Sequence, residues 1–257
     1  MNRLLNYKKF IKNINESVDS DELVGKIDYT LLKPEATEAE IIELCEKAKI
    51  LGVKSVCVLP KMVKVASESL KESNVLVCTV VSFPQGTNTS EEKLEETSSV
   101  INDGADEVDM VLNYPLLKEK GWDAHEELHR EIDSLADICH RHRNKNNEKV
   151  ILKVIVESGL LSDEETEIAT EACLDGGADF IKTSTGMISG PGAELNKVKI
   201  MRDIITKYGS DMKIKASGGI RTMEDLKNFE PYVDRFGVGF GAVDSIFGNQ
   251  ETGSDGY

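Results

Sequence analysis

Short apolar, β-branched runs alternate with longer, charge-rich amphipathic segments along almost the whole chain. Strands are predicted at 26–32, 55–60, 75–83, 107–113, 149–158, 179–185, 213–218 and 235–240. Helices are predicted between them at 37–51, 61–73, 90–103, 122–143, 162–175, 194–208 and 222–229. Strands that alternate with helices are joined by crossovers, so they run parallel in one sheet.

This alternation continues through 257 residues without a linker or a change of composition, which fits one closed barrel better than an open sheet. We therefore predict an α/β fold of the (β/α)8 or TIM-barrel class, with a single domain over 1–248 and a polar tail over 249–257. An additional helix is expected at about 3–15, before the first strand. Thr37 with Glu40, and Ser162 with Glu165, have the spacing of capping boxes.

The charge balance and the cysteines restrict the partners and the compartment. Asp and Glu outnumber Lys and Arg by 46 to 31. This argues against a nucleic-acid partner, because the chain has no excess of basic residues to neutralise phosphates. The five cysteines form no CxxC pair and lie in apolar runs, as expected of buried thiols in a reducing compartment. Neither a signal peptide nor a membrane span of about 20 apolar residues is recognisable. A cytoplasmic location without membrane contact is predicted.

Charged residues inside the predicted strands are informative, because parallel strands covered on both faces are normally almost continuously apolar. A lysine at a strand end can simply reach solvent, which is the preferred interpretation of Lys213. Lys153 and Glu157 are most simply explained as a structural ion pair. The charged residues in the strands are Asp28, Asp109, Lys153, Glu157, Lys182, Lys213 and Lys215.

Lys182 and Lys215 require a different explanation. They lie on neighbouring predicted strands, each just before a turn rich in Gly and Ser or Thr, and catalytic side chains in barrels come from the carboxyl ends of several strands. An ordinary lysine, with a pKa of about 10.4, is a poor nucleophile at neutral pH. Burial and a neighbouring cation both lower a lysine pKa. One lysine could then attack a carbonyl, while Asp109 holds the second and moves protons.

These residues lie in segments that resemble the deoxyribose-phosphate aldolases, a class I aldolase family with a TIM-barrel fold. FIKTSTG together with KASGGIRT is a highly specific combination, and the segments follow the family's order over nearly the whole chain. They are KIDYTLL (26–32), VCVLP (56–60), GADEVDMVLN (104–113), LKVIVESG (152–159), GADFIKTSTG (177–186) and KIKASGGIRT (213–222).

The resemblance implies a role for each matching residue. Lys182 would be the Schiff-base nucleophile, Lys215 its electrostatic partner and Asp109 the acid of the proton relay. Asp28 would orient substrate hydroxyls. Some family members end in a tyrosine that joins the relay, so Tyr257 is a candidate, although a polar tail explains this ending equally well.

The resemblance also implies a phosphate site, and here the chain departs from the family. Glycines after the sixth and seventh strands would bind phosphate through backbone N–H groups. After the eighth strand, however, Gly239 and Phe240 replace the family's Ser-Ser pair, and the negative charge of Asp244 follows. Backbone amides of 239–241 remain available. The expected substrate-binding residues are Asp28, Gly186, Gly218, Gly219, Gly239 and Phe240.

We therefore expect reversible cleavage of 2-deoxy-D-ribose 5-phosphate to glyceraldehyde 3-phosphate and acetaldehyde through a lysine Schiff base. The main alternative is the same chemistry on an unphosphorylated or modified aldehyde, because the Ser-Ser pair is absent. A catalytically silent barrel and a metal-dependent aldolase are further alternatives.

No cofactor or metal is expected. His125 and His129 have helical i, i+4 spacing, but a solvated helix face explains them better than a metal site. The glycine-rich run at 237–241 is a weak dinucleotide signal, because it follows the last strand without an acidic partner. The expected partner is a small aldehyde or sugar phosphate. Family members are commonly dimers or tetramers, which implies a homo-oligomer.

Overall fold

The computed structural model of the protein describes residues 22–247, without the side chains of residues 244 and 245. The predicted helix at 3–15, the predicted tail at 249–257 with Tyr257, and the side chain of Asp244 therefore lie outside the described part. Within the described part, no helix is long and apolar enough to span a bilayer.

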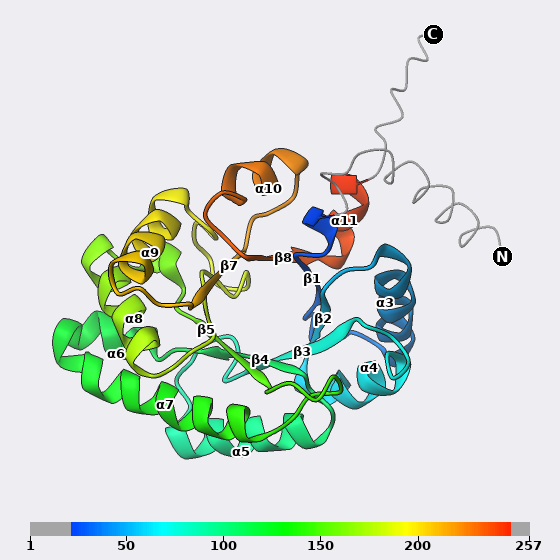
Figure 1. Ribbon diagram of the computed structural model, residues 1–257, viewed down its shortest axis with the longest axis horizontal. Helices are drawn as coiled ribbons and strands as arrows, with labels where there is room; N and C mark the ends of the chain where they lie inside the picture. Colours follow the sequence, from blue (N-terminus) through cyan, green and yellow to red (C-terminus); the bar gives the residue numbers. More distant parts are fainter. Residues whose placement is uncertain (1–21, 248–257) are drawn as a thin grey trace, which may run out of the picture.

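Eight parallel strands form a closed barrel in sequence order, and helices surround it (Figure 1). Closure comes from β8, which pairs with β1 in a register that places Thr30 opposite Gly239. The predicted (β/α)8 class is confirmed. The strands are β1 (Ile27–Leu31), β2 (Ser55–Val58), β3 (Leu76–Val81), β4 (Glu107–Val111), β5 (Ile151–Ile155), β6 (Phe180–Lys182), β7 (Lys213–Ser217) and β8 (Arg235–Gly239).

The helices follow the predicted order, with two additions. A separate helix precedes the predicted 122–143 segment, because Asn113 caps the backbone N–H of Leu116 and Gly121 interrupts the chain at φ 54°. Another helix follows β8. It was not predicted, because the glycine-rich run at 237–241 is not a typical helix start. The helices are α3 (Glu38–Leu51), α4 (Val63–Ser69), α5 (Ser90–Asn102), α6 (Tyr114–Lys120), α7 (His125–Arg141), α8 (Asp163–Asp175), α9 (Leu195–Lys207), α10 (Met223–Phe229) and α11 (Phe240–Phe247).

Both predicted capping boxes are present. The backbone N–H of Glu40 donates to Thr37 Oγ1 at 3.3 Å, and the N–H of Thr37 donates to Glu40 Oε2 at 2.8 Å. Ser162 and Glu165 make the equivalent pair at the start of α8. These bonds satisfy backbone donors that have no partner inside the helix.

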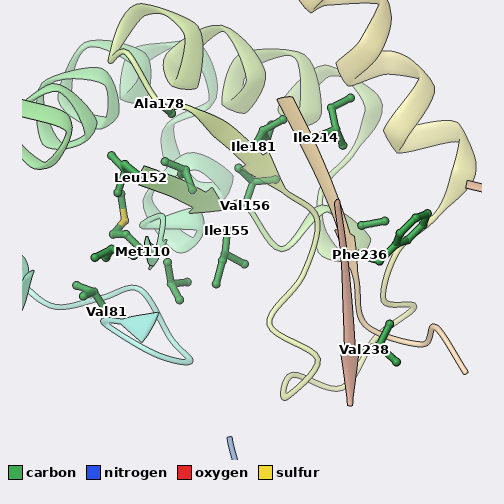
Figure 2. Packing of buried hydrophobic residues seen from close by; sticks show 14 of the residues in the cluster. Val81, Met110, Leu152, Ile155, Val156, Ala178, Ile181, Ile214, Phe236 and Val238 are labelled. Carbon is green, nitrogen blue, oxygen red and sulfur yellow. The ribbon is translucent and has the colours of Figure 1, made fainter. Parts of the chain in front are cut away.

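The hydrophobic core lies between the outer wall of the barrel and the helices. Side chains alternate along each strand, so Ile181, Ile214 and Phe236 point outward into this layer (Figure 2). The strand residues between them point into the barrel, and there the charged groups meet. Apolar packing outside the barrel thus fixes the backbone that carries the polar interior.

Truncating the outer wall should destabilise the fold. Ile181 is 0% exposed in the middle of β6, so Ile181→Ala should lower the free energy of unfolding by about 2–5 kcal/mol. Ile42, on the outer side of α3, is 46% exposed, and Ile42→Ala should change the same quantity by less than about 0.5 kcal/mol. Urea unfolding followed by circular dichroism measures both. Equal losses would contradict the placement of the core.

Candidate active site

Seven charged side chains meet inside the barrel, and we call them the barrel cluster. Strand alternation points them inward, and parallel register places Lys182 opposite Lys215 and Asp109 opposite Lys153. All seven are buried. The barrel cluster consists of Asp28, Glu107, Asp109, Lys153, Lys182, Lys215 and Arg235.

Asp109 is the centre of the barrel cluster. Its Oδ2 accepts hydrogen bonds from Lys182 Nζ at 2.8 Å and from Lys215 Nζ at 2.7 Å. Its Oδ1 accepts one from Lys153 Nζ at 2.8 Å. Burial alone would raise the pKa of Asp109, but the three lysines hold that pKa well below its usual range. The predicted meeting of Lys182, Lys215 and Asp109 is therefore present in the structure.

Asp28 holds Lys215 from the opposite side. Its carboxylate pairs with Lys215 Nζ at 2.5 Å and with Arg235 Nη1 at 2.6 Å, and it accepts a hydrogen bond from Ser55 Oγ at 2.7 Å. Burial would raise the pKa of Asp28, but Arg235 and Lys215 lower it. Asp28 is fully buried and does not line the pocket described below. In this arrangement it positions Lys215, and its expected contact with substrate hydroxyls stays a prediction.

Four cations face three carboxylates in the barrel cluster, which leaves an excess of one positive charge. The Lys153 and Lys215 side chains are 0% exposed, whereas that of Lys182 is 4% exposed. Lys182 is also the barrel-cluster residue that lines the pocket. An incoming molecule therefore meets the Lys182 amine first.

Gly237 makes room for Lys215, a role that the sequence did not indicate. A Cβ at this position would lie 2.8 Å from Ser217 Cβ and 3.3 Å from Lys215 Cε. The glycine-rich run therefore serves close packing around a buried lysine. Its position on the strand beside Lys215 is the signal in the sequence that points to this role, and the weak dinucleotide pattern does not.

A pocket of about 310 Å³ opens at the carboxyl end of the barrel, above Lys182. It is lined by four of the glycines that are expected to bind substrate, and by Lys33 and Arg221, which sequence reasoning did not single out. No carboxylate lines it among the described residues. The four glycines are Gly186, Gly218, Gly219 and Gly239.

Phe240 does not occupy this pocket, contrary to the expectation. Its ring lies 5.5 Å from the ring of Tyr29, and Lys47 Nζ lies 4.6 Å from its centre. Gly239 is the last residue of β8 and lines the pocket, whereas Phe240 begins α11 and packs against the hydrophobic core. Phe240 therefore does not line the pocket in this structure.

The prediction of an ion pair between Lys153 and Glu157 is wrong, because each of the two side chains has other partners. Lys153 Nζ pairs with Glu107 at 2.7 Å as well as with Asp109. Glu157 has a left-handed backbone with φ 52°. Its Oε2 accepts hydrogen bonds from the backbone N–H and the hydroxyl of Thr185, at 3.0 and 2.7 Å. Glu157 thus fixes the loop that follows Lys182.

Lys213 and the histidines remain outside the pocket. Lys213 is exposed at the start of β7, as expected of a strand end. On α7, His125 Nε2 lies 3.3 Å from Asp175 Oδ2 and His129 Nδ1 lies 3.6 Å from Glu126 Oε2. Both rings therefore lie beside carboxylates and are partly buried, rather than on a fully solvated face.

Two sets of buried groups bring three potential metal ligands together within the described residues. They are Cys57, Cys78 and Asp109, and Asp28, Cys78 and Glu107. In both sets the carboxylates already pair with lysine or arginine. Burial raises the pKa of the Cys78 thiol well above its usual range, which disfavours the thiolate that metals bind. The donor chemistry favours ion pairs over a metal ion.

Comparison with known proteins places the site in context. Residues 23–233 match the family described as DeoC/LacD family aldolase. The chain is 44% identical over 201 residues to deoxyribose-phosphate aldolase of Staphylococcus carnosus, covering 78% of this chain and 84% of that protein. It is also 44% identical over 210 residues to deoxyribose-phosphate aldolase of Clostridium perfringens strain SM101, covering 82% and 88%.

Solved structures show the same likeness. The tetrameric deoxyribose phosphate aldolase of Aeropyrum pernix superposes with a TM-score of 0.76 at 28% identity, covering 93% of this chain and 95% of that one. QR15, an aldolase, superposes with a TM-score of 0.76 at 34% identity, covering 90% and 95%. The likeness covers the whole barrel.

Removing Arg235 should lower the free energy of unfolding, because two buried carboxylates then lose a charged partner. Arg235→Met leaves Asp28 and Glu107 without this partner, and should lower the free energy of unfolding at pH 7 by about 3–5 kcal/mol. Because the folded-state pKa of Asp28 is lowered, its contribution is complete above an unfolded pKa of about 3.9 and is lost as the pH falls below it. The difference from wild type should therefore shrink below about pH 4.

The matched control is Arg130→Met. Arg130 is 73% exposed and pairs with Glu126 on α7, so its loss should cost less than about 1 kcal/mol. Chemical unfolding at pH 7 and at about pH 2.5, well below the unfolded pKa, measures both variants. A pH-independent loss for Arg235→Met would argue against the role given to Asp28.

Proposed function

The chain belongs to the DeoC/LacD family of aldolases, and we propose that it carries out their chemistry with Lys182 as the Schiff-base nucleophile. Its reaction is that of a deoxyribose-phosphate aldolase, the reversible cleavage of 2-deoxy-D-ribose 5-phosphate to glyceraldehyde 3-phosphate and acetaldehyde. The observation that carries the proposed role is the carboxylate oxygen of Asp109 shared by Lys182 and Lys215, directly below the pocket.

The charge balance supports Lys182 as the lysine that gives up its proton. Burial alone would lower the pKa of Lys215, but Asp109 and Asp28 raise it far above its usual range. Lys215 therefore stays protonated at neutral pH. Loss of one proton from the barrel cluster removes its excess positive charge, and the amine at the pocket is the one that a carbonyl can reach. A neutral amine is the form that attacks.

In the proposed reaction, Lys182 Nζ attacks the aldehyde carbon of the open-chain sugar to give a carbinolamine. Loss of water gives an iminium, which accepts the electron pair when the C2–C3 bond breaks and a base removes the proton of the C3 hydroxyl. Glyceraldehyde 3-phosphate leaves and an enamine remains. Asp109 and Lys215, with water, supply the proton that converts the enamine to an iminium of acetaldehyde. Hydrolysis restores Lys182. A role for Tyr257 in this relay stays a prediction.

The pocket's charge supports a phosphorylated substrate. The protein carries a formal net charge of −15, yet the charged residues lining the pocket are Lys33, Lys182 and Arg221. A local excess of positive charge in an acidic protein selects anions. Backbone N–H groups at the glycines lining the pocket add donors for a phosphate. The unphosphorylated acceptor remains the alternative, because the hydroxyl pair is absent at Gly239.

We also propose a homo-oligomer, a dimer or a tetramer, in the cytoplasm. The tetrameric Aeropyrum pernix relative supports assembly. All five cysteines are free and buried in the structure, which accords with a reducing compartment.

Trapping with borohydride tests the nucleophile. With acetaldehyde and borohydride, wild-type protein should gain one ethyl group on Lys182, located by peptide mass spectrometry. Lys182→Ala should gain none there and should lose cleavage activity to background. Lys213→Ala is the matched control, because Lys213 is the exposed lysine of the neighbouring strand β7, and it should keep the adduct. An adduct formed only on another lysine would refute the assignment.

A comparison of two substrates tests whether the enzyme prefers a phosphorylated sugar. Cleavage of 2-deoxyribose 5-phosphate and of 2-deoxyribose is measured side by side in EDTA, and the phosphorylated sugar should be preferred by at least about 100-fold in kcat/KM. Comparable or negligible rates on both would favour the alternative acceptor while leaving the Lys182 chemistry intact. Loss of turnover in EDTA would instead indicate a metal-dependent aldolase.

A further inference from the structure

We propose that Lys33 is a specificity-determining residue, whose ammonium group binds the substrate phosphate beside Gly239, where side-chain hydroxyls are missing. The inference rests on the proposed function, because it assigns a contact within the same pocket. Three observations carry it, namely the position of Lys33 at the seam of the barrel, the open space at Gly239, and the way Lys33 is held in the absence of substrate.

The seam between β1 and β8 brings Lys33 to the pocket. Thr30 of β1 lies opposite Gly239 of β8, and Lys33 follows Thr30 by three residues in the loop that leads to α3. Lys33, Thr30 and Gly239 all line the pocket. Lys61 Nζ donates to the backbone oxygen of Pro34 at 2.6 Å, which holds this loop against the neighbouring βα loop. Lys33 therefore belongs to a loop that is held in place and lines the same pocket as Gly239.

The space beside Gly239 is open. A Cβ built on Gly239 has no heavy atom within 4 Å. The following side chain, Phe240, packs on Tyr29 and does not line the pocket. The two positions that would offer hydroxyls thus offer only backbone, and they leave room at the mouth. A lysine side chain, with its flexible four-carbon stem, is suited to reach an anion there.

Lys33 pairs with Glu40, and the hydrogen bonds by which Glu40 caps α3 do not require Lys33. Lys33 Nζ donates to Glu40 Oε1 at 2.6 Å, and the Lys33 side chain is 43% exposed. Glu40 Oε2 is already satisfied by the backbone N–H and the hydroxyl of Thr37, at 2.8 and 3.0 Å. Glu40 would therefore keep its capping bonds if Lys33 turned away, and exposed ion pairs of this kind contribute little net stability.

A phosphate offers Lys33 a stronger partner. It carries more charge than a carboxylate, and charge-assisted hydrogen bonds to it are among the strong ones. Arg221 lines the same pocket and would add a second cation to the phosphate site, while the Lys182 amine lies at the pocket's base. Lys33 and Arg221 come from the βα loops after β1 and β7. The pocket thus has cations from two loops at its mouth and the reactive amine below.

The test compares Lys33→Gln with Lys33→Arg and with Lys71→Gln. Lys71 is an exposed lysine in the turn between α4 and β3, at the opposite end of the barrel, so Lys71→Gln makes the same change in net charge away from the pocket. Lys33→Gln should raise KM for 2-deoxyribose 5-phosphate by roughly 10- to 100-fold with little change in kcat. Values for unphosphorylated 2-deoxyribose should not change.

Binding of inorganic phosphate, measured by calorimetry, gives a readout independent of turnover. Lys33→Gln should weaken it, whereas Lys33→Arg and Lys71→Gln should stay near wild type. Glu40→Gln, which keeps a side chain able to cap α3, should tighten it severalfold because Lys33 is no longer held by a carboxylate. Unchanged phosphate affinity in Lys33→Gln, or equal increases of KM for both sugars, would overturn the inference.

The outcome separates this inference from the proposed function. Borohydride trapping of acetaldehyde does not involve a phosphate, so Lys33→Gln should still form the adduct on Lys182. Absence of that adduct in wild-type protein would refute the proposed nucleophile while leaving phosphate binding by Lys33 open to calorimetry. An intact adduct with unaltered phosphate affinity in Lys33→Gln would refute only the role of Lys33.

Discussion

The carboxylate of Asp109 lies between the ammonium groups of Lys153, Lys182 and Lys215, and the barrel interior depends on this arrangement. Water cannot screen buried charges, so each must have a partner or the fold loses the desolvation energy of that group. A single shared carboxylate keeps two lysines within reach of one oxygen. It thereby stabilises a concentration of positive charge that would otherwise be expelled from the barrel.

The charged side chains inside the barrel lie at different levels along its axis, and the same interaction explains this arrangement. Below the lysines, Arg235 pairs with both Asp28 and Glu107. These carboxylates also pair with Lys215 and Lys153, so their charges are satisfied without the pocket. Lys182 lies at the top of the barrel cluster, where the strands end and the loops begin. The lower layer fixes the position of Lys215, and Lys215 with Asp109 fixes the surroundings of the Lys182 amine.

The wall of the barrel separates two different environments. Outside it, apolar side chains pack against the helices and provide most of the burial that stabilises the fold (Figure 2). Inside it, hydrogen bonds and ion pairs determine geometry. Because alternate residues of one strand serve the two environments, the apolar layer holds the charged groups in register. The positive pocket within a strongly acidic protein combines the strand residue Lys182 with two cations from loops, since Lys33 and Arg221 follow β1 and β7.

The sequence by itself determined the order of strands and helices, because hydrophobic periodicity and capping boxes are local properties. It also determined that Lys182 and Lys215 are neighbours, since consecutive parallel strands pair and both lysines precede equivalent turns. Only the tertiary structure decided which side chains meet across the barrel. Arg235 reaches Asp28 over a separation of 207 residues, through barrel closure. The direction of Phe240, likewise, depends on where β8 ends and α11 begins, which no local pattern specifies.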